Sequence, residues 1–193
     1  MHDVQAAGGT PVGQDRTPRP GSSGRLLLLV SVATGVLVLD LATKLVAVRE
    51  LSDREPVVLL GGALTLRLVR NPGAAFGMAQ GLTVVLTSVA VVVVVLILRM
   101  ARRLSSAPWA AALGLVLGGA TGNLADRLFR APAPGRGHVV GFLELPRWPV
   151  FNLADSAIVV AGVLMVFLSA RGVPYAEPAS AGDPPAEGNT NPG

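Results

Sequence analysis

The chain has 193 residues, of which 51% are hydrophobic and 15% are charged, and its formal net charge is +4. Soluble chains carry about 25% charged residues, so this composition argues against an ordinary soluble enzyme and indicates a polytopic membrane protein. The absence of cysteine excludes disulfides, thiolate metal sites and a cysteine nucleophile. The arginines flank apolar runs instead of forming one patch, which favours membrane flanks over nucleic-acid binding.

Both ends of the chain are rich in glycine, proline and polar or small residues that build no core. We expect residues 1–24 and 172–193 to be disordered tails, and residues 25–171 to form one membrane domain. Four apolar runs in that domain have about the length that a bilayer requires. They lie at about residues 26–48, 82–98, 109–128 and 152–170.

The segment between the first two apolar runs is not membrane-like. Pro56 to Leu60 and Leu64 to Val69 read as strands, and the Pro72-Gly73 pair signals a turn. A further strand-like piece, His138 to Glu144, precedes the last run. The sequence therefore predicts an all-α polytopic membrane protein with four transmembrane helices and a small extracytoplasmic platform rich in β-structure.

Polar side chains gather at one end of the predicted bundle. In an up-and-down arrangement, the ends of the first and third helices and the starts of the second and fourth lie on the same side. Ionisable groups at membrane depth are costly and are usually functional. The residues concerned are Asp40, Lys44, Asn71, Asn123, Asp126, Arg127, Asn152 and Asp155.

Two close carboxylates in such a site cannot both ionise cheaply, so one of them holds a proton. The charged one can then take a proton from water while the neutral one protonates the leaving group, with asparagines orienting both. This is the chemistry of an aspartic protease, without a metal. The alternative is a set of helix caps and ion pairs, such as Asp40 with Lys44, or Asp126 with Arg127 or Arg130.

One cluster of arginines, rather than their total on each side, favours one orientation of the helices in the membrane. The tally of positive charges on the two sides does not decide it, but Arg99, Arg102 and Arg103 crowd the shortest loop and favour a cytoplasmic position for that loop. Both termini are then cytoplasmic, and the polar cluster lies at the outer face.

Four motifs, in order along Leu26 to Ala170, carry a resemblance to a known family. They are Asp40-Leu41-Ala42-Thr43-Lys44, Asn71-Pro72-Gly73-Ala74-Ala75-Phe76-Gly77, Gly118-Gly119 through Gly122-Asn123-Leu124-Ala125-Asp126-Arg127, and Phe151-Asn152-Leu153-Ala154-Asp155-Ser156. Together they make the chain resemble the lipoprotein signal peptidase, or signal peptidase II, family, and the long tails resemble those of actinobacterial members.

The resemblance implies a monomeric aspartyl peptidase of the bacterial inner membrane, without cofactor or metal. Its partners would be membrane lipids and prolipoproteins that carry diacylglyceryl on a cysteine, which it cuts just before that cysteine; it would not bind nucleic acid. Asp155 matches the second catalytic aspartate of the family. The matching support residues are Asp40, Lys44, Asn71, Asn123, Asp126, Arg127 and Asn152.

One position departs from the family pattern. The first catalytic aspartate normally stands in a Val-Val-Asp-Phe segment, which reads Val139-Val140-Gly141-Phe142 here. We favour an inactivated or substituted copy of a peptidase. The alternatives are a homologue that binds lipidated peptides without cleaving them, or a dyad completed by Asp126 or Glu144. From another class, a small membrane transporter is the rival, although the charges gather at one face and do not thread the bilayer.

Overall fold

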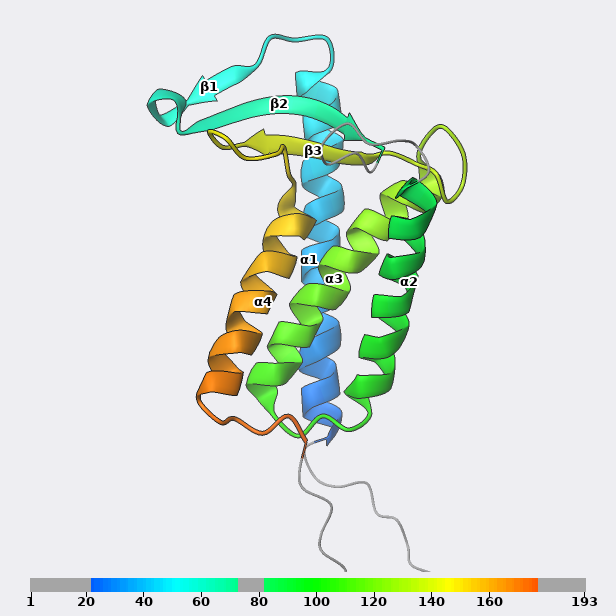
Figure 1. Cartoon of the computed structure of the whole chain (residues 1–193), viewed down its shortest axis with the longest axis vertical. Helices are drawn as coiled ribbons and strands as arrows, with labels where there is room; N and C mark the ends of the chain where they lie inside the picture. Colours follow the sequence, from blue (N-terminus) through cyan, green and yellow to red (C-terminus); the bar gives the residue numbers. More distant parts are fainter. Residues whose placement is uncertain (1–21, 73–81, 177–193) are drawn as a thin grey trace, which may run out of the picture.

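In the part of the chain that the structure describes, four helices run side by side, and a three-stranded sheet lies across one end of them (Figure 1). This computed structural model describes residues 22–72 and 82–176. The helices are α1 (Ser22–Leu51), α2 (Leu82–Ala101), α3 (Ala107–Phe129) and α4 (Leu153–Ala170). The sheet contains β1 (Val57–Leu59), β2 (Leu64–Asn71) and β3 (Val139–Glu144), and a short 3-10 helix, η1 (Leu60–Gly62), connects the first two strands.

The element bounds differ from the predicted ones mainly at the helix ends. α1 begins at Ser22, inside the predicted tail, and Arg25 in its first turns donates a hydrogen bond to the carbonyl oxygen of Ser105. Asn152 precedes α4 as its N-cap instead of being its first helical residue. The predicted tails at residues 1–21 and 177–193, and Gly73 to Gly77 of the second motif, lie outside the described residues.

Three of the helices are long and apolar enough to cross a membrane: Ser23–Leu51, Thr83–Ala101 and Leu153–Ala170. α3 is not among them, so the prediction of four such helices is confirmed only in part. Its glycine and alanine residues add little hydropathy, and its last turns carry Asn123, Asp126 and Arg127. α3 nevertheless occupies the middle of the bundle, where it contacts α1, α2 and α4 (Figure 1).

Glycines let α3 approach its neighbours closely. A Cβ atom added at Gly118 would lie 2.6 Å from the carbonyl oxygen of Ala33 in α1, and one added at Gly119 would lie 2.6 Å from that of Ala154 in α4. Small residues at such positions allow helix backbones to pack at short range in membrane proteins. The same close packing brings the C-terminal turns of α1 and α3 against the first turn of α4.

The sheet is antiparallel in the order β1-β2-β3, and its register fixes the position of Gly141. Val69 of β2 is opposite Gly141, and Asn71 is opposite Val139. On its other edge, β3 is bridged by Leu143 to Phe151, the residue that leads into α4. β3 is therefore held between β2 and the start of α4, directly above the helix ends (Figure 1).

Candidate active site

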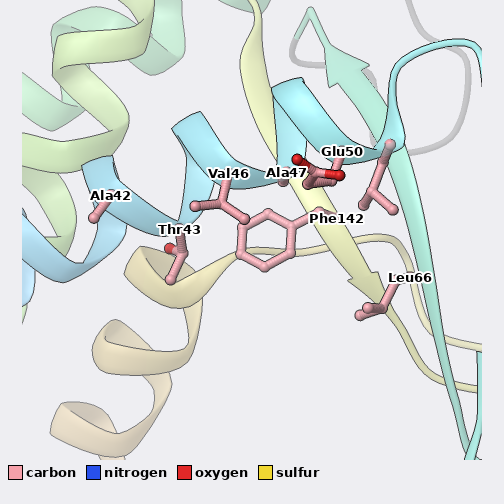
Figure 2. A pocket seen from close by; sticks show the side chains of 8 residues that line it. Ala42, Thr43, Val46, Ala47, Glu50, Leu66 and Phe142 are labelled. Carbon is pink, nitrogen blue, oxygen red and sulfur yellow. The ribbon is translucent and has the colours of Figure 1, made fainter.

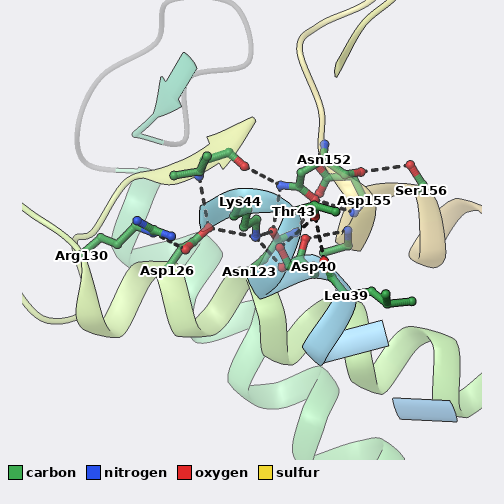
Figure 3. Close-up of polar contacts among 12 residues, drawn as sticks. Leu39, Asp40, Thr43, Lys44, Asn123, Asp126, Arg130, Asn152, Asp155 and Ser156 are labelled. Atoms are coloured by element: carbon green, nitrogen blue, oxygen red, sulfur yellow. Dashed lines mark hydrogen bonds and ion pairs between the residues drawn. The ribbon is translucent and has the colours of Figure 1, made fainter. Parts of the chain in front are cut away.

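Lys44 is the centre of a buried polar cluster between α1, α3 and α4 (Figure 3). Its Nζ atom lies 2.7 Å from Asp40 Oδ2 and 2.8 Å from Asp126 Oδ2, and it donates to Asn123 Oδ1 at 3.1 Å. Two ion pairs and one hydrogen bond therefore engage the ammonium group, and Asp40 Oδ2 takes part through the ion pair alone. The predicted pairing of Asp40 with Lys44 is confirmed, and the side chains of both residues are 0% exposed.

The two carboxylates beside Lys44 also hold other elements in place. Asp40 Oδ1 accepts the backbone N–H of Ala154 at 3.0 Å, so a carboxylate of α1 caps the first turn of α4. Asp126 Oδ2 accepts the backbone N–H of Val140 at 3.1 Å, and Asp126 Oδ1 pairs with Arg130. Of the two partners considered for Asp126, Arg130 makes the ion pair.

Asn152 joins β3, α3 and α4. Its Nδ2 atom donates to the carbonyl oxygen of Val140 at 3.0 Å and to Asn123 Oδ1 at 3.1 Å, and its Oδ1 atom accepts the backbone N–H of Asp155 at 2.9 Å. The side chain is fully buried, so these bonds replace those that it would make to water. Sequence reasoning missed Val140, whose main chain holds β3 to the cluster; a main-chain role leaves no signature in residue type.

Asp155 is fixed by two hydrogen bonds, one to each oxygen of its carboxylate. Oδ1 accepts Asn123 Nδ2 at 2.7 Å, and Oδ2 accepts the backbone N–H of Asn152 at 3.1 Å (Figure 3). Together with the bond from Asp155 N to Asn152 Oδ1, this makes a capping box at the start of α4. The side chain therefore has a defined position, set by one residue of α3 and by the cap of its own helix.

One peptide group connects Asp155 to the segment around Gly141. The N–H of the Phe151–Asn152 peptide is the donor to Asp155 Oδ2, and the carbonyl oxygen of the same peptide accepts the N–H of Phe142 at 2.9 Å. The Asp155 carboxylate and the backbone after Gly141 are thus bound to opposite ends of a single peptide unit. This is the neighbourhood in which two side chains of a catalytic pair could meet.

Glycine at position 141 is not required by the backbone. Its φ angle does not fall in the left-handed region, in contrast to that of four other glycines of the described chain, including Gly61 and Gly135. A Cβ atom at Gly141 would lie 3.3 Å from both Val150 Cγ1 and the carbonyl oxygen of Val150. A Cβ atom at this position therefore requires Val150, including its backbone, to move by a few tenths of an ångström.

Arg127 is the cation of the cluster with unused hydrogen-bonding capacity. It is 8% exposed, and its charge is attracted by both Asp126 and Asp155. Among residues 22–72 and 82–176, no acceptor bonds to its buried Nη1 atom. A buried guanidinium group is costly when its charge is not compensated, and Asp126 and Asp155 provide that compensation here.

The remaining predicted residues lie around this core. Asn71 ends β2, opposite Val139, which places it near the segment that Asn152 and Asp126 hold. Glu144 lies at the other end of β3, opposite Thr65, where it pairs with Arg67 at 2.7 Å. Within the described ranges, no three histidine, aspartate or glutamate side chains converge in a way that could hold a metal ion.

The chain is similar to proteins of a known family. Residues 32–171 match the profile of a family described as "Signal peptidase (SPase) II". A lipoprotein signal peptidase of Mycobacterium avium is 53% identical over 167 residues, which cover 86% of this chain and 89% of the relative. One of Rhodococcus jostii is 53% identical over 156 residues, covering 81% of this chain and 79% of the relative.

A solved structure described as a bacterial membrane enzyme shares the fold. It superposes with a TM-score of 0.65 at 21% identity, and the match covers 74% of this chain and 87% of that chain. The profile spans the polar cluster, β3 and all four helices except the first turns of α1. The chain therefore belongs to the signal peptidase II family.

Proposed function

We propose that this protein is a membrane aspartyl endopeptidase that removes signal peptides from prolipoproteins, cutting before a cysteine that carries diacylglyceryl. Family membership supports the reaction class, and curated relatives are named lipoprotein signal peptidases. The observation that carries the assignment to residues is the position of Asp155. Its carboxylate is held by Asn123 and Asn152 and shares one peptide group with the strand that contains Gly141.

In the proposed reaction, water attacks the carbonyl carbon of the scissile peptide. Both oxygens of Asp155 accept hydrogen bonds in the structure, which suits the role of the base that takes the proton from this water. The positive charge of Arg127, which interacts with the negative charge of Asp155, would help to stabilise the negative charge that develops on the carbonyl oxygen. Collapse of the tetrahedral intermediate then breaks the C–N bond and releases the amine of the cysteine, which needs a proton.

The acid that supplies this proton is what the chain lacks. In the family, an aspartate at position 141 would complete the pair, and glycine has no side chain to do so. Asp126 is a poor substitute, because Lys44, Arg130 and the N–H of Val140 already occupy its oxygens. Glu144 is tied to Arg67 at the far end of β3. We therefore infer that the chain as printed cleaves slowly.

The same glycine favours a second candidate function. A protein that keeps Asp155, Arg127 and the asparagines but lacks the acid could bind lipidated peptides without turning them over. Tight binding of a diacylglyceryl peptide, with no cleavage by either the printed chain or Gly141→Asp, would identify this function. A transporter fits less well, because the buried charges gather at the sheet end of the bundle (Figure 3).

We further propose that α3 is the fourth membrane-spanning helix, since it lies among three helices that are apolar enough to cross. In this arrangement the sheet and the polar cluster lie at the extracytoplasmic face of the inner membrane. The start of α1 and the end of α4 lie at the end of the bundle away from the sheet, which supports cytoplasmic termini (Figure 1). The enzyme would act as a monomer among membrane lipids.

The experiment is a gel-shift cleavage assay in proteoliposomes with a diacylglyceryl prolipoprotein. It compares the printed chain with Gly141→Asp and, as a matched control without an acid, Gly141→Asn. Positioned acid–base catalysis contributes about 10²–10⁴-fold, so we expect Gly141→Asp to gain at least the lower value and Gly141→Asn to gain nothing. Equal rates for all three proteins would refute the assigned pair of residues.

A further inference from the structure

An elongated apolar pocket of about 310 Å³ lies between the C-terminal half of α1 and the sheet (Figure 2). One side of it is α1, and the other is formed by one side chain each from β2 and β3. The lining residues are Ala42, Thr43, Val46, Ala47, Glu50, Leu51, Leu66 and Phe142. None of them belongs to the polar cluster described above, so the pocket needs its own explanation.

The atoms that line the pocket are almost all carbon. The hydroxyl of Thr43 is turned back to its own helix, where it donates to the carbonyl oxygens of Leu39 at 2.8 Å and Asp40 at 3.0 Å. Glu50 is 61% exposed, and its carboxylate lies 3.4 Å from Arg54, so it marks the outer rim. A peptide backbone placed inside would find no partners for its N–H and C=O groups, whereas an alkyl chain needs none.

The length of the pocket also favours an alkyl chain. The lining runs from Ala42 to Leu51, which is roughly 13 Å along a helix that rises 1.5 Å per residue. This is longer than any amino-acid side chain. Leu39 and Leu45 beside it are 58% and 52% exposed on a helix that is apolar enough to cross a membrane, so the pocket adjoins lipid.

The pocket is next to the proposed reaction centre. Phe142, whose ring lies beside α1 near Val46 in Figure 2, follows Gly141 directly, and its N–H is bound to the peptide group that positions Asp155. Thr43 precedes Lys44, the centre of the polar cluster. An alkyl chain bound in the pocket would therefore have the group attached to its end close to the residues proposed to cut the substrate.

We propose that this pocket binds one acyl chain of the diacylglyceryl group on the substrate's cysteine, an inference that rests on the proposed function. The bilayer interior is as apolar as the pocket wall. Transfer of the acyl chain from the bilayer to the pocket therefore changes the affinity of the enzyme for its substrate little. The pocket would instead position the substrate, because an acyl chain held along α1 fixes where the modified cysteine lies relative to Asp155. Correct positioning of reacting groups is a large part of catalysis, and a small displacement costs about 10²-fold.

The direct test does not need turnover. The printed chain is reconstituted with a diacylglyceryl peptide that carries a photoreactive diazirine in one acyl chain, and the adducts are mapped by mass spectrometry. We expect adducts on Ala42 to Leu51 and on Phe142. Ala42→Phe, at an exposed position that faces the pocket, should fill it and reduce these adducts about tenfold, the size expected of overpacking. Leu45→Phe, which is on the same helix and lines no part of the pocket, should not.

Three results would overturn the inference. The first is adducts spread evenly over the lipid-facing residues, and the second is an adduct pattern that Ala42→Phe leaves unchanged. The third is loss of the adducts on adding phospholipid as readily as on adding unlabelled lipidated peptide, which would identify an ordinary membrane lipid as the occupant. Each of these is read without measuring cleavage.

Cleavage by Gly141→Asp separates this inference from the proposed function. In that background, Ala42→Phe should lower kcat by about 10²-fold with little change in KM, and Leu45→Phe should change neither. If Gly141→Asp does not cleave but the adducts fall in the pocket, the proposed function fails and the pocket assignment stands. If Gly141→Asp cleaves and Ala42→Phe cleaves equally fast, the pocket assignment fails alone.

Discussion

Replacing Lys44 with methionine removes the ammonium group that contacts Asp40, Asp126 and Asn123 together. Methionine has a similar length and leaves no cavity, so the change acts mainly on charge and hydrogen bonding. Asp40 and Asp126 remain, at 0% and 2% exposure, without this partner. The substitution therefore isolates the electrostatic role of Lys44 from its packing role.

The expected loss of stability follows from the burial of the ion pairs that Lys44 makes. Breaking a buried ion pair by removing one partner destabilises a protein by about 3–5 kcal/mol, because the other charge is left uncompensated. For a chain of this size, that corresponds to a decrease in Tm on the order of 10 °C. Arg54→Met is the matched control: it breaks an ion pair with Glu50 that is 64% and 61% exposed, and exposed pairs contribute about 1 kcal/mol or less.

Thermal unfolding in detergent compares the two variants with the printed chain. Adding Asp40→Asn to Lys44→Met should recover part of the loss, because it removes the carboxylate charge that Lys44 compensates, whereas Asp126 keeps its ion pair with Arg130; a double-mutant cycle measures this coupling. If Lys44→Met and Arg54→Met unfold at the same temperature, or if the cycle shows no coupling between residues 40 and 44, the reasoning from burial is wrong.

Three further predictions concern packing and the site. Gly118→Ala should destabilise by about 1–3 kcal/mol, because its Cβ would meet Ala33 O at 2.6 Å, whereas Gly35→Ala, with open space around it, should stabilise by about 0.5–1 kcal/mol; thermal unfolding distinguishes them. In the Gly141→Asp background, Asp155→Asn should abolish cleavage, and cleavage that survives would exclude Asp155 as the base. In the same background, Arg127→Gln should lower kcat by about 10²–10³-fold, and an effect on KM alone would assign Arg127 to substrate binding.

The sequence predicted the elements well where hydrophobic runs are long and bounded by polar groups. α1, α2 and α4 were expected within a few residues of their observed bounds. The prediction was weakest at the start of α1, where residues 22–24 look like part of a tail but are helical. Arg25 binds the loop before α3 at Ser105, a tertiary contact that local composition does not encode.

The residues of the polar cluster were predictable, but their connections were not. Helix order indicated that Asp40, Lys44, Asn123 and Asp155 meet at one end of the bundle, and spacing gave the pair of Asp40 with Lys44. The capping of α4 by Asp40 of α1 needed the close approach of α1, α3 and α4, which depends on how the glycines of α3 pack. The apolar pocket likewise arises from the distance between α1 and the sheet, which no motif specifies.

The charges of the polar cluster predict the protonation state of an aspartate introduced at position 141. Asp40, Asp126 and Asp155 bring three formal negative charges, and Lys44, Arg127 and Arg130 bring three positive ones. An aspartate at position 141 would be a fourth carboxyl group in a buried place. Keeping a proton is its least costly state there, and in the proposed reaction this proton would go to the leaving amine.

The acid that would restore catalysis should therefore weaken the fold. It buries a polar group and presses its Cβ against Val150 at 3.3 Å, and a misfit of this kind typically costs about 1–3 kcal/mol. We expect Gly141→Asp to cleave faster and to unfold at a lower temperature than the printed chain. Gly141→Ala provides the control: it introduces the same Cβ contact without the carboxyl group, so it should lose stability in part and gain no activity. If Gly141→Asp is at least as stable as the printed chain, position 141 is not in the buried, charge-balanced environment described here.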